Sequence, residues 1–368
     1  MKKIVFLSNS YTIQGGGERS LVQLIEYIKD KYEIFVYVKR EGELSKALHN
    51  LGVKVFFSEL SWSRKIKKQI SNYINLFKVY LAVKKIKPNL IYVNSGDINP
   101  FGVRLSRLLN VNIITHIRDV FDFPKKDKYL FHKSNAIIAD SNIVKEMVSN
   151  FNNKVEIIYN GIDKNKFKFY TYEEKKVKKQ SLFGDFFLVA NIGTIVEKKG
   201  FLEFVEVANK ICKVLKDIKF LIIGSPKPKE ELFLANLKER IKIYNLENRI
   251  CFMGFIEEID KILPLIDILL FPTRKEAFGR VIIEAFASGV PVISTYSGGP
   301  QEIIENRKDG FLVKVGDIQG MYDAVIELYR NKDLYEYIRK NAYKKFLENF
   351  TIDNIAQKIT RIIENLSS

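Results

Sequence analysis

Short runs of apolar, often β-branched residues alternate along the chain with longer stretches whose apolar positions recur every three or four residues. The short runs predict buried parallel strands, and the longer stretches predict helices that cover both faces of a sheet. In the first half the strands are predicted at 3–7, 34–38, 54–57, 90–93, 112–116, 136–140 and 155–159, and helices at 18–28, 44–51 and 66–86. In the second half the strands are predicted at 187–192, 220–223, 250–253, 268–271, 290–294 and 311–313, and helices at 200–214 and 230–243.

The alternation stops once and then starts again, which predicts two doubly wound α/β domains. The interruption begins at Asn160-Gly161, a turn signal, and continues through 164–180, which is rich in Lys, Tyr and Glu and predicts a linker followed by a solvated helix. We therefore expect one domain at 1–163 and a second at 164–350. The tail, 351–368, predicts an amphipathic helix that packs back on the first domain. Ligands of such sheets bind outside the carboxyl ends of the strands, so a site is expected in the cleft between the domains.

Composition narrows the class of protein. The chain is 46% hydrophobic and 28% charged, a globular balance, and its 2 Cys have no CxxC spacing. The unpaired thiols and the absence of a long apolar run favour a cytoplasmic protein without a transmembrane helix. We interpret the apolar start at residues 4–7 as a buried strand because it is too short for a signal peptide.

The net charge of +17 indicates an anionic partner. Nucleic acid, an acidic membrane surface and a phosphorylated small molecule all fit that charge. A nucleic-acid-binding protein is the non-enzymatic alternative, but no RNA-binding or helix-turn-helix motif is recognisable, so we expect no nucleic-acid partner.

Three glycine-containing segments follow predicted strands and precede helices, where backbone amides can hold an anion. Gly15-Gly16-Gly17 lacks the GxGxxG spacing of a dinucleotide site, and 193–201 offers Lys199 to a diphosphate. The strongest is 271–293, in which Glu276 precedes a helix expected over 279–288. Glu284 lies on the apolar face of that helix. A buried carboxylate needs hydrogen-bonding partners, either sugar hydroxyls or a core basic residue.

Glu276 and Glu284, separated by seven residues in EAFGRVIIEAFASGVPVIS, resemble the E-x7-E motif of retaining glycosyltransferases of the GT-B fold. Residues 297–304 and 309–313, Asn160-Gly161-Ile162-Asp163, Lys199-Gly200 and the opening glycines continue the pattern. The match is closest to glycosyltransferase family four (glycosyl transferases group 1) and covers nearly the whole chain. It implies two Rossmann-like domains facing a cleft, and transfer of a sugar from a nucleotide-diphosphate donor to a carbohydrate or lipid-linked acceptor. Surface polysaccharide or glycolipid biosynthesis is the expected setting.

The resemblance also implies roles for individual residues. Glu284 would hold the ribose, Glu276 would contact the transferred sugar, and Lys199 would neutralise the departing diphosphate. The remaining donor-binding positions are Gly15, Gly16, Thr194, Ala277, Phe278, Gly279 and Arg280. Thr194 departs from the family, many members of which carry arginine there, so Lys199 or Arg280 is expected to take over part of its task.

His116 ends a predicted strand of the first domain and is expected to face the cleft and hold the donor sugar. Its alternative is a structural hydrogen-bonding role. Arg118 and Asp119 follow it and are assigned to the acceptor side. No metal-binding cluster is recognisable, so we expect no metal and no cofactor. A GT-B epimerase or phosphorylase is the enzymatic alternative. The sequence does not specify the sugar, base, acceptor, linkage or oligomeric state.

Residues 62–87 contain eight Lys or Arg and no acid, with apolar residues at helical spacing. Basic amphipathic helices with aromatic residues lie in the headgroup region of anionic membranes. This segment, with Lys125-Lys126-Asp127-Lys128, is therefore expected to attach the protein peripherally to the inner face of the cell membrane. The alternative is a helix that covers the sheet while its lysines face water.

Overall fold

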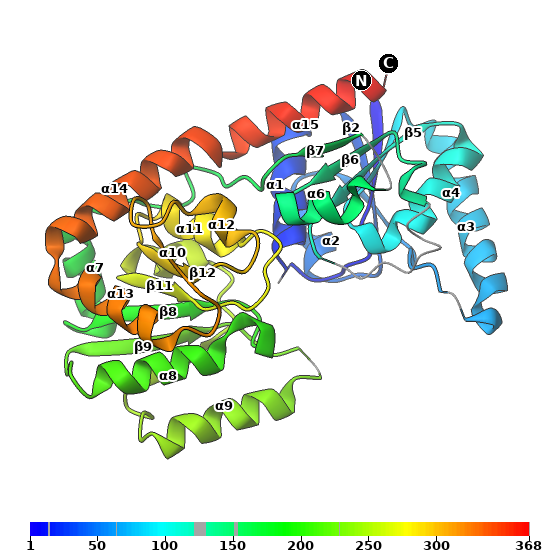
Figure 1. Ribbon diagram of the computed structural model, residues 1–368. Helices are drawn as coiled ribbons and strands as arrows, with labels where there is room; N and C mark the ends of the chain where they lie inside the picture. The colour runs from blue at the N-terminus through cyan, green and yellow to red at the C-terminus, as the bar shows by residue number, and fades with distance from the viewer. Residues whose placement is uncertain (14, 64, 121–129, 151–153, 228, 368) are drawn as a thin grey trace. The chain divides into compact units, whose positions relative to one another are not determined.

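The computed structural model describes the 368-residue chain except residues 14, 64, 121–129, 151–153, 228 and 368. The described chain forms two compact units (Figure 1). Met1–Gly161 and Ile352–Ser368 make unit 1, and Ile162–Thr351 makes unit 2. Every strand predicted from the apolar runs is present, and both sheets are parallel throughout.

Unit 1 contains a seven-stranded sheet in the order β3-β2-β1-β4-β5-β6-β7. Its strands are β1 (Lys3–Leu7), β2 (Glu33–Val38), β3 (Lys54–Phe57), β4 (Leu90–Val93), β5 (Asn112–Ile117), β6 (Ala136–Ala139) and β7 (Val155–Ile157). Its helices are α1 (Gly16–Ile28), α2 (Glu43–Asn50), α3 (Ile66–Ile86), α4 (Asn99–Leu109), α6 (Asn142–Ser149) and α15 (Ile352–Leu366), with the short η1 (Gly96–Ile98). The pattern does not predict α4 and α6.

Successive strand residues of unit 1 enter cores on opposite faces of the sheet. Ile4 and Phe6 of β1 pack with α1, α2 and α15, whereas Val5 and Leu7 pack with α3 and α4. The predicted tail helix is α15, which lies against α1 although the two helices are at opposite ends of the chain (Figure 1). Helices cover both faces of the sheet because a parallel sheet presents apolar side chains on both faces.

Unit 2 contains a six-stranded sheet in the order β10-β9-β8-β11-β12-β13. Its strands are β8 (Phe187–Ile192), β9 (Ile218–Ile223), β10 (Ile250–Gly254), β11 (Ile268–Phe271), β12 (Val292–Thr295) and β13 (Phe311–Val313). Its helices are α7 (Tyr172–Phe183), α8 (Phe201–Cys212), α9 (Glu231–Ile243), α10 (Ile259–Ile262), α11 (Arg280–Ala287), α12 (Pro300–Ile303), α13 (Ile318–Arg330) and α14 (Lys332–Asn349), with η2 (Glu197–Lys199) and η3 (Leu263–Leu265). Among these, α10, α12, α13 and α14 are not predicted.

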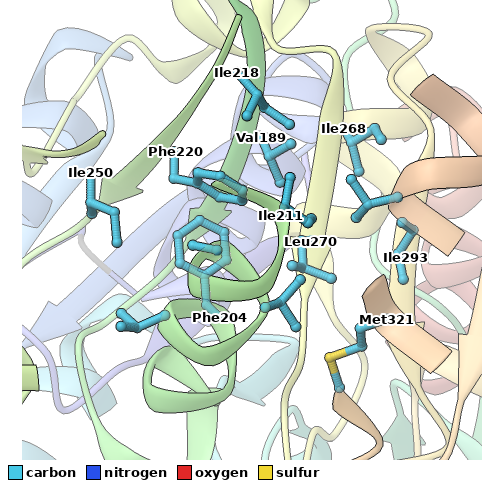
Figure 2. Packing of buried hydrophobic residues seen from close by; sticks show 14 of the residues in the cluster. Val189, Phe204, Ile211, Ile218, Phe220, Ile250, Ile268, Leu270, Ile293 and Met321 are labelled. Carbon is cyan, nitrogen blue, oxygen red and sulfur yellow. The ribbon is translucent and has the colours of Figure 1, made fainter. Parts of the chain in front are cut away.

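One core of unit 2 lies between the sheet and helices α8, α9, α13 and α14. Figure 2 shows Phe204 of α8 beside Phe220 of β9, and their rings meet edge to face with centroids 5.6 Å apart. Val189, Leu270 and Ile293 extend the same core across neighbouring strands. This packing fixes the strands whose following loops carry the predicted site residues.

The expectation of a solvated helix after the linker is wrong for one side chain of α7. Lys175 is 4% exposed, and its ammonium lies 3.2 Å from a carboxylate oxygen of Asp267. It also donates to the hydroxyl of Tyr335, 3.2 Å away. Burial lowers the pKa of Lys175 below its ordinary value, and the Asp267 carboxylate acts in the opposite direction. The sequence pattern gives no sign of this burial because a lysine among lysines does not reveal that its partner, Asp267, lies 92 residues away, directly before β11.

Candidate functional site

The loop that carries Glu276 connects β11 to α11 in unit 2. It is held by backbone hydrogen bonds on both sides of Glu276: the Glu276 N–H donates to the Ser297 carbonyl at 3.0 Å, and the Gly299 N–H donates to the Glu276 carbonyl at 2.9 Å. Gly279 then adopts a left-handed conformation, with φ of 98°, directly before α11. The turn therefore requires a residue without a Cβ at 279 and fixes the direction in which Glu276 leaves the sheet.

Gly299 is required by the close approach of a second loop. A Cβ at this position would lie 2.3 Å from Phe278 Cα and 2.5 Å from the Ala277 carbonyl oxygen. The downstream Ser297-Gly298-Gly299-Pro300 segment thus supports the 276–279 loop directly. These backbone contacts explain why residues 276–279 and residues 297–300 form one structural unit although they are separate motifs in the sequence.

Lys199 and Glu276 form an ion pair between η2, which follows β8, and the loop that follows β11. Their side chains are 19% and 14% exposed. The approach depends on Gly200, whose φ is 71° and whose Cβ would lie 1.9 Å from the Pro272 carbonyl oxygen. Two residues predicted for catalysis therefore meet, and the pair places a cation and a carboxylate together at the carboxyl ends of neighbouring strands.

Glu284 is paired with Arg280, one turn earlier on α11. The Arg280 Nε donates to a carboxylate oxygen at 2.9 Å, and the side chains are 10% and 8% exposed. Of the two partners expected for Glu284, the structure contains the basic residue. Both side chains are buried, so each charge stabilises the other in a poorly solvated place.

Thr194 follows β8 and is half-buried. Two cationic residues of this region, Arg274 and Lys199, contact carboxylates. Arg274 donates to Glu203 at 2.6 Å and to Glu197 at 3.2 Å. The side chain of Thr194 is neutral and cannot contribute a positive charge. Lys199 is the cation of this region that contacts Glu276.

The opening glycines form the start of α1 in unit 1. Gly15 is the residue before the helix, and a Cβ there would lie 2.2 Å from Glu18 Oε2. The Glu18 carboxyl group therefore folds back over the glycines. Burial raises the pKa of Glu18, and the nearby Asp119 carboxylate raises it further.

His116, which is expected to face the cleft, is fully buried. The reason is local: Tyr92 of β4 places its hydroxyl 2.5 Å from His116 Nδ1, and the Arg118 guanidinium lies 3.1 Å from the same nitrogen. The other ring nitrogen, Nε2, is buried and has no hydrogen-bond partner among the residues that the structure describes. Burial, with a smaller effect of the Arg118 charge, lowers the pKa of His116 well below its ordinary value of 6.5.

Arg118, assigned from sequence to the acceptor side, is directed into unit 1. Its Nε donates to Asn94 Oδ1 at 3.2 Å, and its Nη1 donates to Asn160 Oδ1. Asp119 is exposed. Tyr92, Asn94 and Asn160 were not predicted as parts of this cluster. Asn94 and Asn160 each come directly after a predicted strand, which was the available signal.

Among the described residues, no group of three or more His, Cys, Asp and Glu side chains is arranged to hold a metal ion. Within the same part of the chain, no helix has the length and apolar character needed to cross a bilayer. Cys212 and Cys251 are both free thiols.

Two family models match the chain. Residues 14–166 match "Glycosyltransferase Family 4", and residues 173–345 match "Glycosyl transferases group 1". The 2-deoxystreptamine N-acetyl-D-glucosaminyltransferase of Niallia circulans is 30% identical over 161 residues, which are 43% of this chain and 40% of that protein. The chain thus matches less than half the length of that relative.

A relative matched over more of its length is the UDP-Gal:alpha-D-GlcNAc-diphosphoundecaprenol alpha-1,3-galactosyltransferase of Escherichia coli. It is 25% identical, with 94% of this chain and 92% of that protein covered. The crystal structure of Anabaena HepE in complex with UDP and glucose superposes with a TM-score of 0.88 at 22% identity and covers 100% of both chains. The two parallel sheets, the motif loops and these matches agree: the chain belongs to glycosyltransferase family four and has the GT-B fold.

Proposed function

We propose that the protein is a retaining glycosyltransferase that moves a sugar from a nucleotide-diphosphate donor to a carbohydrate or lipid-linked acceptor. The observation that carries this proposal is the Lys199–Glu276 ion pair at the carboxyl ends of β8 and β11. An ammonium group there can neutralise charge that develops on a departing diphosphate, and a carboxylate can accept hydrogen bonds from sugar hydroxyls.

The roles divide among residues of unit 2. Lys199 acts on the leaving diphosphate, and Glu276 orients the sugar with the backbone at Ala277 and Phe278. Glu284 binds the ribose after exchanging its Arg280 partner for the two ribose hydroxyls. Arg280 then binds the diphosphate and takes the place of the arginine that other family members carry at the position of Thr194. Charge neutralisation by Lys199 and Arg280 supports a reaction without a metal ion or cofactor.

The relatives support the setting in surface polysaccharide or glycolipid biosynthesis. The name of the Escherichia coli protein specifies a UDP-linked donor and a diphosphoundecaprenol-linked acceptor, and HepE was crystallised with UDP and glucose. We infer a uridine nucleotide as the first donor class to test.

The test is turnover of UDP-glucose, UDP-galactose, UDP-N-acetylglucosamine and GDP-mannose by the full chain in the presence of carbohydrate and lipid-linked acceptors, measured as nucleotide release and by NMR of the anomeric proton of the glycosylated acceptor. We expect one donor to be consumed with its α configuration kept, and Lys199→Ala and Glu276→Ala to lose activity. Lys198→Ala is the matched control because Lys198 is the exposed neighbour of Lys199. Full turnover in both site variants, or an inverted product, would contradict the proposal. Interconversion of the free nucleotide sugar would indicate an epimerase, and a requirement for phosphate a phosphorylase.

We also propose that unit 1 binds the anionic inner face of the cell membrane through α3. The helix packs on the core through Leu76, Val79 and Val83, yet a second apolar row remains in solvent. In that row Ile70 is 75% exposed, Ile74 52%, Phe77 57% and Leu81 46%. Lys65, Lys68, Lys78, Lys84, Lys85 and Lys87 are also exposed.

An apolar row beside lysines suits a helix that lies in the headgroup region, where each basic residue contributes about 1 kcal/mol or less. The second predicted contact, Lys125-Lys126-Asp127-Lys128, lies outside the described residues.

The experiment is co-sedimentation with vesicles of phosphatidylcholine with and without phosphatidylglycerol. We expect preference for the anionic vesicles, lost in Ile70→Ser/Phe77→Ser and in Lys65→Glu/Lys68→Glu. Leu232→Ser is the control because Leu232 is 84% exposed on α9 of unit 2. Equal recovery on both vesicles would exclude this attachment.

A further inference from the structure

The short helix η2 carries Lys199 and depends on the rest of unit 2 for its shape. Its own hydrogen bonds run from the Lys199 N–H to the Val196 carbonyl and from the Gly200 N–H to the Glu197 carbonyl, both at 3.0 Å. Hydrogen bonds of the 3₁₀ type have poor geometry, which is why such helices stay short. The backbone position of Lys199 is therefore set by contacts that η2 makes with other segments.

Residues 272–274, which follow β11, supply several of those contacts. The Lys198 carbonyl accepts the Arg274 N–H at 2.8 Å and the Thr273 hydroxyl at 3.0 Å. Thr273 is fully buried, so its hydroxyl is shielded from competing water. Two donors on one carbonyl fix the middle of η2 against the end of β11.

The side chain of Arg274 joins η2 to helix α8. Its Nε donates to Glu203 of α8 at 2.6 Å, and its Nη1 donates to Glu197, the first residue of η2, at 3.2 Å. The Glu203 side chain is only 9% exposed, whereas that of Glu197 is 68% exposed. A buried carboxylate needs a partner, so Glu203 holds Arg274 firmly and Arg274 in turn restrains Glu197.

The second oxygen of Glu203 increases this dependence on Arg274. Glu203 Oε2 is buried and has no hydrogen-bond partner within the described part of the chain. The guanidinium therefore stabilises a carboxylate that is otherwise poorly satisfied. A substitution of Arg274 alone would leave that charge buried without its cation.

We propose that Arg274 is a positioning residue for Lys199: by bridging Glu203 and Glu197 it fixes η2 and keeps the Lys199 ammonium beside Glu276. These three residues, Glu203, Arg274 and Glu197, are called the Arg274 bridge below. Its effect on the reaction rests on the proposed function, in which Lys199 neutralises the leaving diphosphate. The bridge itself does not, because its contacts all lie within unit 2.

The ammonium of Lys199 is sensitive to the position of η2 because its partners belong to a different segment. It pairs with Glu276 and lies 5.0 Å from the centre of the buried Phe271 ring, a cation–π contact. Both partners come from β11 and its following loop, so a shift of η2 relative to β11 moves the Lys199 backbone away from them. A misplacement of about 1 Å can lower the rate of a reaction about a hundredfold, even when the substituted residue does not touch the substrate.

The bridge is tested without substrate by amide hydrogen exchange of the full chain, followed by mass spectrometry of peptides. In Arg274→Gln we expect the amides of residues 199–200 to exchange about tenfold faster, while those of β8 keep the wild-type rate. Arg274→Gln/Glu203→Gln removes the unpaired buried charge and should show the same local acceleration in a stably folded protein.

Arg240→Gln is the matched control for this exchange measurement. Arg240 pairs with Glu206 of the same helix α8 at 3.2 Å and is 42% exposed, close to the 44% of Arg274, but its pair joins α8 to α9. Wild-type exchange at residues 199–200 in the double variant, or equal acceleration in Arg240→Gln, would overturn the proposal whether or not the protein transfers sugar.

Calorimetry with UDP then tests whether Arg274 acts through Lys199. We expect Arg274→Gln to weaken UDP binding about five- to tenfold in the wild type and less than about twofold when position 199 already carries Lys199→Ala. Arg274→Lys keeps a cation for Glu203 and should recover part of the affinity. Equal weakening in both backgrounds, or no recovery with lysine, would overturn the positioning role. No UDP binding by the wild type would instead contradict the proposed function, while hydrogen exchange would still decide the bridge.

Discussion

The ammonium of Lys199 contacts the carboxylate of Glu276 across a separation of 77 residues in the chain. The two side chains come from loops after β8 and β11, which are hydrogen-bonded neighbours in the sheet of unit 2. Neither charge is needed to fill the core, because each side chain remains partly exposed. We therefore expect the pair to act on ligands more than on stability.

Lys199 and Glu276 should affect nucleotide binding in opposite directions. In the proposed function Lys199 contacts the diphosphate, so Lys199→Ala is expected to weaken UDP binding about ten- to hundredfold, as measured by calorimetry. Glu276→Gln removes the negative charge that pairs with Lys199, so on the proposed function UDP binding should stay constant or tighten while turnover of the UDP-sugar is lost. Weaker UDP binding in both variants would contradict this division of roles.

Gly299→Ala should reduce activity by displacing the loop that carries Glu276. The added Cβ would meet backbone atoms of Ala277 and Phe278 at 2.3–2.5 Å, and such overpacking costs about 1–3 kcal/mol. Gly316→Ala is the control: its φ is 80°, so alanine strains the backbone, but nothing lies within 4 Å of the new Cβ. Denaturation and turnover should show a stability cost in both variants and an activity loss in Gly299→Ala alone. Normal turnover in Gly299→Ala would show that the loop tolerates displacement.

Asp267→Ala should destabilise unit 2 strongly. Asp267 contacts Lys175 at 3.2 Å and Lys179 at 2.7 Å, and it accepts from the Leu188 N–H at 2.7 Å. Its removal leaves the buried Lys175 charge without that carboxylate, a type of change that costs about 3–5 kcal/mol. Lys175→Met/Asp267→Leu removes both charges and should cost less than Asp267→Ala, as measured by urea denaturation. A double variant less stable than Asp267→Ala would show that the pair itself stabilises the fold.

The stability of the protein should fall below about pH 6.5 in a way that depends on His116. The pKa of His116 is lowered in the fold, whereas the unfolded chain has the ordinary value of 6.5. The unfolded state therefore binds a proton below that pH that the folded state does not, and the free energy of unfolding decreases by up to about 1.4 kcal/mol per pH unit. Glu18, with its raised pKa, acts in the opposite direction, so the comparison is between wild type and His116→Gln. Parallel curves from pH 7 to 5.5 would contradict the buried neutral histidine.

The residue pattern by itself determined the strands, the doubly wound class and the motifs of the family. β4, β8 and β11 have the bounds that the apolar runs predict, because a strand covered on both faces must be apolar along its whole length. The tail helix α15 was equally readable, since its apolar residues follow a helical period. Gly200 and Gly279 were predicted as the first residues of helices, and they lie directly before α8 and α11 with left-handed backbones that favour glycine.

The tertiary structure alone decided which side chains meet and which face of each helix is buried. On α3 the apolar residues run around the helix, and only the packing of Leu76, Val79 and Val83 shows that Ile70, Ile74 and Phe77 are left in solvent. Lys175 looks solvated among its neighbours but is buried against Asp267. His116 was placed by the pattern at the end of a strand, but only the fold shows that Tyr92 and Arg118 both contact its Nδ1. The physical reason is the same each time: a periodic pattern encodes burial along one element, whereas partners on different elements are set by strand order and by the loops that join the strands.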